Sequence, residues 1–462
     1  DVAAEWIDVN FTNWAQTATW RYDSIMSTNL ADGGNYLIYV RARDKAVNHD
    51  WTAGNNWNVT NATITFAFDS SAPVSVSTSP GSGSPYIGSW SQNEGIRGTA
   101  SDPNSGIIND VKVGIRNNNL MKWWDGSAFN DTPGPTLIST FTFSGQNPEK
   151  FWYVKLQQSD LIDGTSYAVL VQATDSLAQT ESIGKAWTTF YYDISRPTAV
   201  VTVPSHLAYR SNLTRLSGTA ADFTSTISRI EIQITSGTYY YQGPLAGTKF
   251  TTTPKWLQDQ SLDPGNGVLI EYDASAGSWT YRETGSGCTG CLDDNGVWAA
   301  GIAYGVRARG IDNAGNTQNF FGGFQSTFTF DNAGPNSVVV SNLSAYRRSL
   351  LTISGQASDL LQGSGVNISM RFKVRQSSGS NLAWNGSTWQ ENAVYNNAGL
   401  SGAYWELVMP VSAWQEGAAY QITPHALDYS TPTFNASTGS VASYTYDTSA
   451  PTAAVTWPQV NP

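Results

Sequence analysis

The sequence has little charge and few of the residues that most often perform chemistry. Charged residues make up only 13% of the 462-residue chain, which contains two cysteines and three histidines. The formal net charge is -11, and there is no basic run of the kind that neutralises nucleic-acid phosphates. There is also no apolar run of the roughly 18 residues that a membrane-spanning helix requires. We therefore expect no nucleic-acid partner and no membrane insertion in this segment.

Recognised catalytic motifs are also missing. The sequence contains no nucleophile elbow, no HExxH and no phosphate-binding glycine loop. A carboxylate pair for glycoside hydrolysis is not excluded by sequence, but acids that recur in every repeat fit a structural role better than one active site. We expect no enzyme activity.

The start of the chain, "DVAAEWIDVN", lacks the basic and apolar regions of a signal peptide. Export must therefore be argued from composition. A lysine-poor, aromatic-rich chain that takes its polarity from Gly, Ser, Thr and Asn is typical of an extracellular, cell-surface setting.

What the sequence does contain is an internal repeat. The pattern [LW]-x-x-G-x-x-Y-x7-D occurs four times with one spacing, so repetition is the first firm conclusion. Its four copies begin at Leu30, Leu161, Trp298 and Trp414, contain Tyr36, Tyr167, Tyr304 and Tyr420, and close with Asp44, Asp175, Asp312 and Asp428.

A second signature follows each copy and marks the junctions between repeats. It consists of two aromatic residues separated by one position, then Asp, then Pro four positions later. Successive prolines are 116 to 138 residues apart, which is one compact domain per interval. The four junction acids are Asp69, Asp193, Asp331 and Asp447, and the prolines are Pro73, Pro197, Pro335 and Pro451.

The pattern within each interval predicts β strands. Tyr167, Val169 and Val171 alternate with residues of the opposite face, and period two is typical of a half-buried strand. Further strands follow at roughly ten-residue spacing with no helical period, which favours an antiparallel sandwich. The sequence places Pro424 inside the last of these strands, where we expect a bulge or altered pairing. A tryptophan lies upstream of each motif tyrosine and is expected to anchor the core: Trp20, Trp152, Trp279 and Trp405.

These residues resemble a known family. The Leu or Trp, Gly and Tyr before an alternating strand that ends in Ala-x-Asp are similar to the tyrosine corner and penultimate strand of immunoglobulin-like and fibronectin type III-like domains. The chain as a whole resembles the tandem repeats of very large secreted bacterial cell-surface proteins, which are mostly scaffolds, stalks and adhesins. The resemblance implies an all-β fold of tandem immunoglobulin-like antiparallel sandwiches arranged as an extended rod, and it says little about function.

The repeat also predicts where domains begin and end. Only nineteen residues precede Trp20, whereas its counterparts lie 70 to 82 residues after their junction prolines, so the first domain is expected to lack its first half. The final residues copy the start of a repeat, as in a window from a longer array. Strand exchange into another copy is the alternative. The expected division is 1–70 for a C-terminal half domain, 71–194, 195–332 and 333–448 for whole domains, and 449–462 for a first strand.

The repeated acids are the first candidate site. In a sandwich of this type, the junction, the loop after the second strand and the loop after the Tyr strand gather at one pole, so three carboxylates converge in each domain. Calcium prefers such hard oxygen ligands, as in cadherin linkers, although three carboxylates are a sparse set. The other interpretation is that each Asp accepts hydrogen bonds from turn amides. The sets are Asp69, Asp102 and Asp175; Asp193, Asp222 and Asp312; and Asp331, Asp359 and Asp428.

The cysteines lie in an insertion. Cys288 and Cys291 fall in an interval between Trp279 and Tyr304 that is about ten residues longer than its counterparts. A zinc site needs further Cys or His nearby, and a redox CxxC needs a helix. We predict a local disulfide that closes the inserted loop.

The third candidate site is aromatic. Trp124 lies in "WWDGSAF", and Trp384 and Trp389 lie in "WNGSTW". Exposed tryptophans stack on sugars or form interfaces. Asp-Gly and Asn-Gly are also hairpin turn residues, whose flanking aromatics pair as ordinary packing, and this is the favoured interpretation.

Two functional hypotheses follow. The first is a structural repeat segment of an extracellular stalk, fibre or filament, whose partners are further repeats and which could self-associate. The second is an adhesin or carbohydrate-binding array with a glycan or cell-surface partner. A third class is a set of accessory domains carried by a large secreted enzyme.

Overall fold

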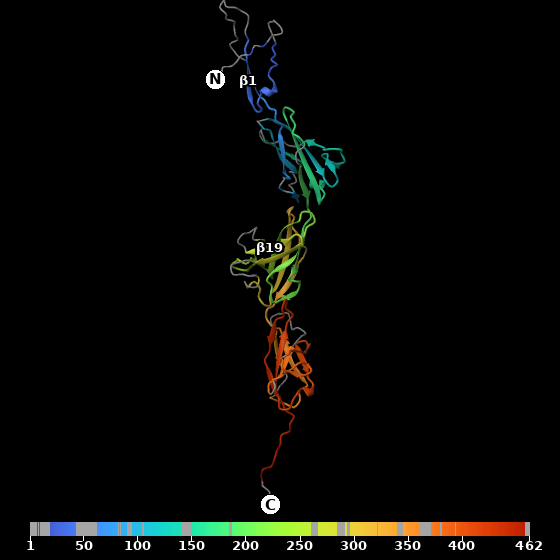
Figure 1. Ribbon diagram of the computed structural model, residues 1–462, viewed down its shortest axis with the longest axis vertical. Coiled ribbons are helices and arrows are strands. Elements are labelled where there is room, and N and C mark those ends of the chain that lie inside the picture. The colour runs from blue at the N-terminus through green and yellow to red at the C-terminus, as the bar shows by residue number, and fades with distance from the viewer. Residues whose placement is uncertain are drawn as a thin grey trace, which may run out of the picture. The chain divides into compact units, whose positions relative to one another are not determined.

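The computed structural model describes residues 7, 9, 19–42, 62–81, 83, 85–89, 95–103, 106–139, 149–183, 187–259, 267–283, 292, 296–320, 322–339, 345–359, 371–378, 381–392 and 394–457. They belong to two compact units, residues 1–195 and 196–462, each of which is described by itself. Strands dominate both units (Figure 1). None of the helices among the described residues is long and apolar enough to cross a membrane.

Among the described residues, the first sheet consists of β1 (Asn35–Val40) and β2 (Ala62–Ala67), which pair antiparallel. Leu37 and Ile38 point to opposite faces of this sheet and are both exposed. Trp20 is likewise 44% exposed. The expectation that Trp20 anchors a core is therefore wrong, because a tryptophan becomes buried only where a second layer faces it.

The first sandwich of the chain pairs a sheet of order β10-β5-β3 with a sheet of order β4-β12-β11-β6-β7-β8, to which β9 adds beside β6. Its strands are antiparallel except for the β4–β12 pair. The bounds are β3 Val74–Ser79, β4 Tyr86–Ile87, β5 Ile96–Ser101, β6 Ile108–Asn117, β7 Lys122–Trp124, β8 Phe129–Asn130, β9 Ile138–Ser139, β10 Glu149–Val154, β11 Thr165–Asp175 and β12 Thr188–Tyr192.

The second sandwich repeats this plan, with sheets of order β13-β15-β20-β19 and β14-β22-β21-β16-β17-β18. Here β19 adds an edge strand beside β20. The bounds are β13 Thr198–Val203, β14 Ala208–Arg210, β15 Leu216–Ala221, β16 Ile227–Ser236, β17 Tyr239–Tyr241, β18 Phe250–Thr251, β19 Val268–Asp273, β20 Ser278–Glu283, β21 Ala303–Asp312 and β22 Ser326–Phe330.

The third sandwich has sheets of order β23-β25-β31-β30 and β24-β34-β32-β26-β27-β28, with β29 beside β26 and β33 beside β32. The bounds are β23 Asn336–Val339, β24 Tyr346–Arg347, β25 Thr352–Ser358, β26 Arg371–Gln376, β27 Ala383–Trp384, β28 Trp389–Gln390, β29 Asn396–Asn397, β30 Gly399–Ser401, β31 Tyr404–Val408, β32 Ala419–Leu427, β33 Ala436–Thr438 and β34 Ala442–Tyr446.

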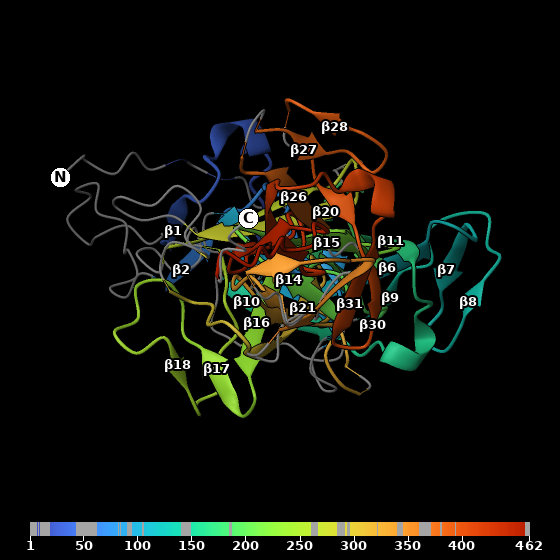
Figure 2. The same ribbon diagram turned by 90° about the horizontal axis from the view of Figure 1, so that it is seen from below.

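All three sandwiches share two departures from a plain antiparallel plan. The chain that leaves β3, β13 or β23 crosses to the opposite sheet, where β4, β14 or β24 pairs parallel to the last strand. The strand that follows Asp102, Asp222 or Asp359, namely β6, β16 or β26, continues into a short hairpin, β7–β8, β17–β18 or β27–β28, which forms one edge of its sheet (Figure 2). The all-β fold of tandem immunoglobulin-like sandwiches is confirmed by this strand order.

The tyrosine corner implied by the resemblance is present in all four copies of the motif. The hydroxyl of Tyr167 accepts a hydrogen bond of 2.9 Å from the amide of Ile162, five residues earlier. The ring of Tyr167 also stacks on Phe190 of the neighbouring strand, with 5.4 Å between centroids. Short 3-10 turns precede three of the motifs, at Ser27–Asn29, Gln158–Asp160 and Val411–Ala413. The equivalent amide donors are Ala31 to Tyr36, Ala299 to Tyr304 and Gln415 to Tyr420.

Each whole sandwich is built around one tryptophan that lies across two strands. Trp152 on β10 is directly opposite Gly98 on β5 and is buried. A Cβ atom on Gly98 would lie 2.3 Å from the Trp152 ring, so only glycine leaves room for the indole. The same pairing joins Trp279 to Gly218 and Trp405 to Gly355.

Pro424 is accommodated by a change of partner strand. On one side, β32 pairs with β26 through Pro424 without a register shift. On the other side, β32 pairs with β34 only as far as Ile422 and with β33 from His425 onward. The proline therefore falls where no ladder donor is needed, and the expected altered pairing is confirmed.

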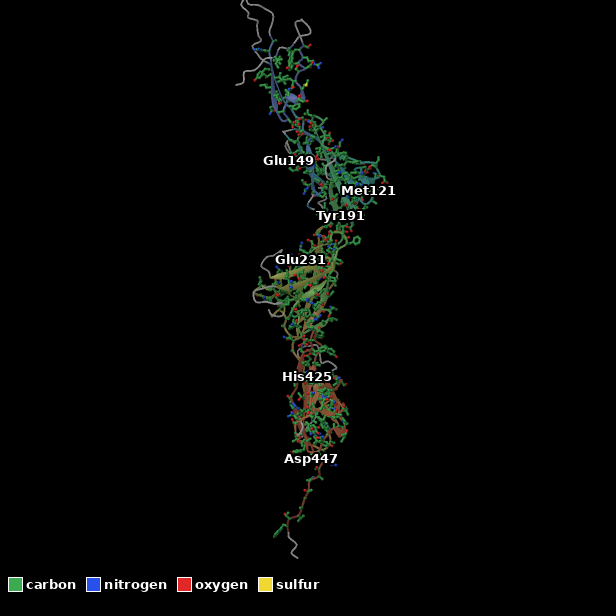
Figure 3. The ribbon with its side chains drawn as sticks, in the orientation of Figure 1. Met121, Glu149, Tyr191, Glu231, His425 and Asp447 are labelled. Carbon is green, nitrogen blue, oxygen red and sulfur yellow. The ribbon has the colours of Figure 1, made fainter. Side chains whose placement is uncertain are left out.

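The chain leaves β34 at Asp447 (Figure 3) and continues as extended backbone. Residues 449–462 were expected to form a first strand. In the described part, 449–457, no strand is formed and Trp457 is exposed. The equivalent strand β13 has β15 beside it, and a strand needs such a neighbour for its ladder.

Candidate metal centres

The junction acids share one local geometry. The Oδ1 atom of Asp193 accepts a hydrogen bond of 3.0 Å from the amide of Ser195, two residues later. This is an Asx turn, which fixes the first residues of the linker. The same bond joins Asp69 to Ser71, Asp331 to Ala333 and Asp447 to Ser449, at 3.0 to 3.3 Å.

The acids that close the Tyr strand also cap turns. Oδ1 of Asp175 accepts the amides of Leu177 and Gln179, each at 2.8 Å. Oδ1 of Asp312 accepts the amide of Asn316 at 2.7 Å. The turn-capping interpretation is therefore correct for one oxygen of each carboxylate, and the second oxygen must be considered separately.

The carboxylates of the predicted sets converge. In the first unit, one oxygen each of Asp69, Asp102 and Asp175 lie within 4.8 Å of one another. In the second unit, the same holds for Asp331, Asp359 and Asp428. The third predicted set contains Asp193 of the first unit with Asp222 and Asp312 of the second, so its members are described one by one.

The buried carboxylate of Asp102 lies beside two other acids, and little compensates its negative charge. The Asp102 side chain is 3% exposed, and neither oxygen has a hydrogen-bond donor among the residues that the structure describes. Burial, together with the negative charges of Asp69 and Asp175, raises the pKa of Asp102 to about 6. The second oxygen of Asp175 is also buried without a donor. Uncompensated buried carboxylates are costly, and a cation placed among them removes that cost.

The second whole domain shows a milder version of this arrangement. Oδ2 of Asp222 accepts the amides of Thr224, Ser225 and Thr226 at 2.8 to 3.1 Å, and Oδ1 is buried without a donor. Burial raises the pKa of Asp312, although bonds from Asn316 oppose the shift. Asp222 therefore has a turn-capping oxygen and a free one, as Asp175 does.

The chemistry of the first cluster fits a hard divalent cation. Three carboxylates supply oxygen ligands of the type that calcium prefers. The cluster offers no thiolate or imidazole, which zinc usually takes. Asp69, Asp102 and Asp175 would hold the ion, and water would complete a shell of six to eight oxygens.

A second set of acids was missed by the sequence analysis and acts on the linkers themselves. Asp163 precedes the motif glycine and accepts the amide of Ile194 at 2.8 Å and the hydroxyl of Ser195 at 2.5 Å. We call this arrangement the linker clamp. The signal was an acid before the glycine in three of the four motifs, the exception being Ala300. The other clamps join Asp32 to Ser70 and Ser71, and Glu416 to Thr448 and Ser449.

The clamp at Glu416 is exposed but well supplied with donors. Hydrogen bonds from the side chains of Thr448 and Ser449 and from the Thr448 amide lower the pKa of Glu416 to about 2. The clamp therefore keeps its charge over the whole physiological range.

The aromatic candidates are packed inside their own domain. Trp124 and Trp384 are 4% and 5% exposed, and Trp389 is partly buried with its indole N–H bonded to the carbonyl of Ala413 at 2.7 Å. Trp124 packs on Phe129 with 5.2 Å between ring centroids. Stacking on a sugar requires an exposed ring face, so the burial of Trp124 and Trp384 supports hairpin packing, the favoured interpretation of the sequence, over sugar binding.

The cysteine prediction cannot be placed in the fold, because Cys288 and Cys291 lie outside the described residues. The predicted disulfide stays a prediction.

Comparison with known proteins finds no matching family model and no matching curated protein. Similar solved structures include the fibronectin(III)-like modules of CbhA from Clostridium thermocellum, at 12% identity over 54% of this chain and 93% of that chain, with a TM-score of 0.24. The three N-terminal domains of the highly immunogenic outer capsid protein of bacteriophage RB49 share 10% identity over 82% and 99%, with a TM-score of 0.31. Drosophila N-cadherin EC1-4 shares 12% over 95% and 89%, with a TM-score of 0.20. Scores this low carry no argument, and the fold assignment rests on the strand order.

Proposed function

We propose that this chain is a non-catalytic structural segment of an extracellular surface stalk, fibre or filament, in which repeats are joined by short linkers of fixed geometry. The observation that carries the proposal is the linker clamp, because it bonds a loop of one repeat to the first linker residues at three junctions. Four positions separate each junction acid from its proline, which leaves a linker little freedom.

Calcium is the proposed cofactor of these junctions. The carboxylate of Asp69 belongs to the linker, whereas in the following domain Asp102 comes directly after β5 and Asp175 ends β11. An ion shared by all three would tie the linker to the ends of both strands. It would also offset the effects of burial and of the neighbouring negative charges, which together raise the pKa of Asp102. Chelation should then loosen the junction without unfolding either domain.

The sugar-binding form of the adhesion alternative has less support, because Trp124 and Trp384 are buried and Trp389 is partly buried in their own domains. A cell-surface partner would have to use another surface, and we do not propose one.

Small-angle X-ray scattering of the intact chain tests the proposal. We expect a rod, whose cross-section is that of one sandwich, with calcium present. A compact globule would contradict the proposal. The variant Asp32→Asn, Asp163→Asn, Glu416→Gln removes the three clamps and should broaden the distribution of interatomic distances at unchanged secondary structure. The matched control is Asp131→Asn, Glu149→Gln, Glu391→Gln, which neutralises three exposed acids outside the clamps.

A further inference from the structure

The two acidic clusters that lie within single units differ in their supply of hydrogen-bond donors. We propose that the cluster of Asp69, Asp102 and Asp175 requires calcium, whereas the cluster of Asp331, Asp359 and Asp428 has hydrogen-bond donors of the protein itself in place of the ion. This inference rests on the proposed function, because it states which junction the ion controls.

In the first cluster, the available donors point elsewhere. The amides of Leu177 and Gln179 bond only Oδ1 of Asp175. The side-chain amide of Gln179 donates to the backbone carbonyl of Asp69 at 3.1 Å. Three buried carboxylate oxygens, both of Asp102 and one of Asp175, have no donor in the described part of the chain. One oxygen each of Asp69, Asp102 and Asp175 lies within 4.8 Å of the other two, so a cation placed among them would compensate the buried negative charge.

In the second cluster, an amide nitrogen and a hydroxyl lie among the carboxylates. Nδ2 of Asn435 is 2.7 Å from Oδ2 of Asp428 and 2.7 Å from the carbonyl oxygen of Asp331. The hydroxyl of Ser430 lies 3.1 Å from Oδ2 of Asp331 and 3.0 Å from Oδ2 of Asp428. The Asp428 oxygen equivalent to the bare one of Asp175 is therefore occupied. A calcium ion would have to displace these groups.

The difference has a cause in the sequence. Gln179 follows Asp175 by four residues, whereas Asn435 follows Asp428 by seven. The Asn435 side chain turns back toward the carboxylates, and the backbone amide of Asn435 also bonds Oδ1 of Asp428 at 2.8 Å. Loop length alone does not decide this contact, because the Asn316 side chain bonds Asp312 from only four residues away. Glutamine takes the place of asparagine in the first cluster, and the Gln179 side chain reaches only a backbone oxygen.

Direct hydrogen bonds also join the two sandwiches at the Asp331 junction. The amide of Thr431 donates to the carbonyl of Tyr209 at 3.1 Å, and the amide of Ser211 donates to the carbonyl of Thr431 at 2.9 Å. These bonds join the second sandwich to the third within one unit. At this junction, Ala300 stands at the motif position where the other three copies have the acid of the linker clamp.

Hydrogen exchange measured by mass spectrometry on the intact chain, in calcium chloride or in EGTA, tests the inference. With calcium at about ten times its dissociation constant, amides of residues 70–72 should exchange about tenfold more slowly, because opening must release the ion. Amides of residues 332–334 should change by less than about twofold. The two linkers serve as internal controls for each other.

Two variants sharpen the test. Asp102→Asn should abolish the calcium effect at residues 70–72 and leave residues 332–334 as they were. Asn435→Ala should make residues 332–334 calcium-sensitive, because it removes the closer of the two donors at Oδ2 of Asp428 and leaves only the Ser430 hydroxyl there. Ser430→Ala removes the other donor and should also make residues 332–334 calcium-sensitive, to a smaller degree. This second variant keeps the inference testable if Asn435→Ala does not fold.

The outcomes separate the inference from the calcium proposal. Protection at residues 70–72 alone supports both. Equal protection at both linkers in the unmodified chain overturns the inference and leaves calcium-stiffened junctions in place. No protection at either linker overturns the calcium proposal itself. A variant Asn435→Ala that folds and stays insensitive to calcium overturns the argument from internal donors.

Discussion

Asp102 and Gly106 are in such close contact that a Cβ atom on Gly106 would lie 2.3 Å from the Asp102 carboxylate carbon. The backbone at Gly106 is thus one wall of the first acidic cluster. It contributes no donor to the carboxylate, since its own amide points to the carbonyl of Pro103. Packing against the backbone of Gly106 holds the carboxylate in place. No hydrogen bond from the described residues compensates its charge.

We expect Gly106→Ala to displace the Asp102 carboxylate. Forcing a methyl group into this contact should destabilise the domain by about 1–3 kcal/mol and weaken calcium binding by roughly tenfold or more. Isothermal titration calorimetry and thermal unfolding measure the two effects. Gly134→Ala is the matched control, because nothing lies within 4 Å of its added Cβ. Equal affinities in the two variants would show that Asp102 does not hold the ion.

The second prediction concerns Asp102→Asn. In EGTA, the variant should be at least as stable as the unmodified chain, because it removes a buried charge that has no donor. In calcium at about a hundred times the dissociation constant, the unmodified chain should gain about 2.7 kcal/mol and the variant almost nothing. Differential scanning calorimetry distinguishes these outcomes. Asp131→Asn, at an exposed acid, should behave as the unmodified chain does. A calcium gain retained in Asp102→Asn would count against the site.

Much of this architecture could be predicted from sequence because it depends on spacing. The interval from Ile162 to Tyr167 contains the whole tyrosine corner, so its repetition was visible and its hydrogen bond followed. The convergence of Asp69, Asp102 and Asp175 followed from strand order alone.

The rest depends on contacts between residues far apart in sequence. The linker clamp joins Asp163 to Ile194 across 31 positions, and spacing alone does not reveal which acid bonds which amide. Asn435 reaches Asp331 across 104 positions through a loop of altered length. The exposure of Trp20 was missed because a repeat pattern says nothing about whether a facing sheet is present.

The third prediction tests the tyrosine corner. Tyr167→Phe keeps the stacked ring but removes the acceptor of the Ile162 amide, so opening of β11 should become easier by about 1 kcal/mol. Native-state hydrogen exchange of residues 165–175 reports this free energy. Tyr191→Phe, at an exposed tyrosine of the neighbouring strand, is the control and should change it little. Equal effects of the two variants on exchange would show that the hydrogen bond from Ile162 to Tyr167 does not stabilise β11.

The fourth prediction concerns pH. Glu283 is buried, and its Oε1 accepts the hydroxyls of Tyr241 and Tyr281 at 2.8 and 2.7 Å. Burial raises the pKa of Glu283 above its ordinary value, so the folded state favours the protonated acid. Its contribution to stability is present below the unfolded-state pKa and is lost as pH rises through the folded-state pKa.

Glu283→Gln does not titrate at this position. The stability of the variant relative to the unmodified chain should therefore increase between pH 4 and pH 8, as measured by chemical denaturation. Glu271→Gln, at an exposed acid bonded to Arg282, is the control. A relative stability that is flat with pH, or that falls, would show that Glu283 is not held in its neutral form.

The most direct test of calcium-bound junctions is a crystal structure of the intact chain grown with calcium, with anomalous differences measured. We predict a peak among Asp69, Asp102 and Asp175, with carboxylate oxygens at about 2.3 to 2.6 Å from it. A structure at saturating calcium that shows Asp102 without a peak, its carboxyl still lacking any partner, would contradict the account.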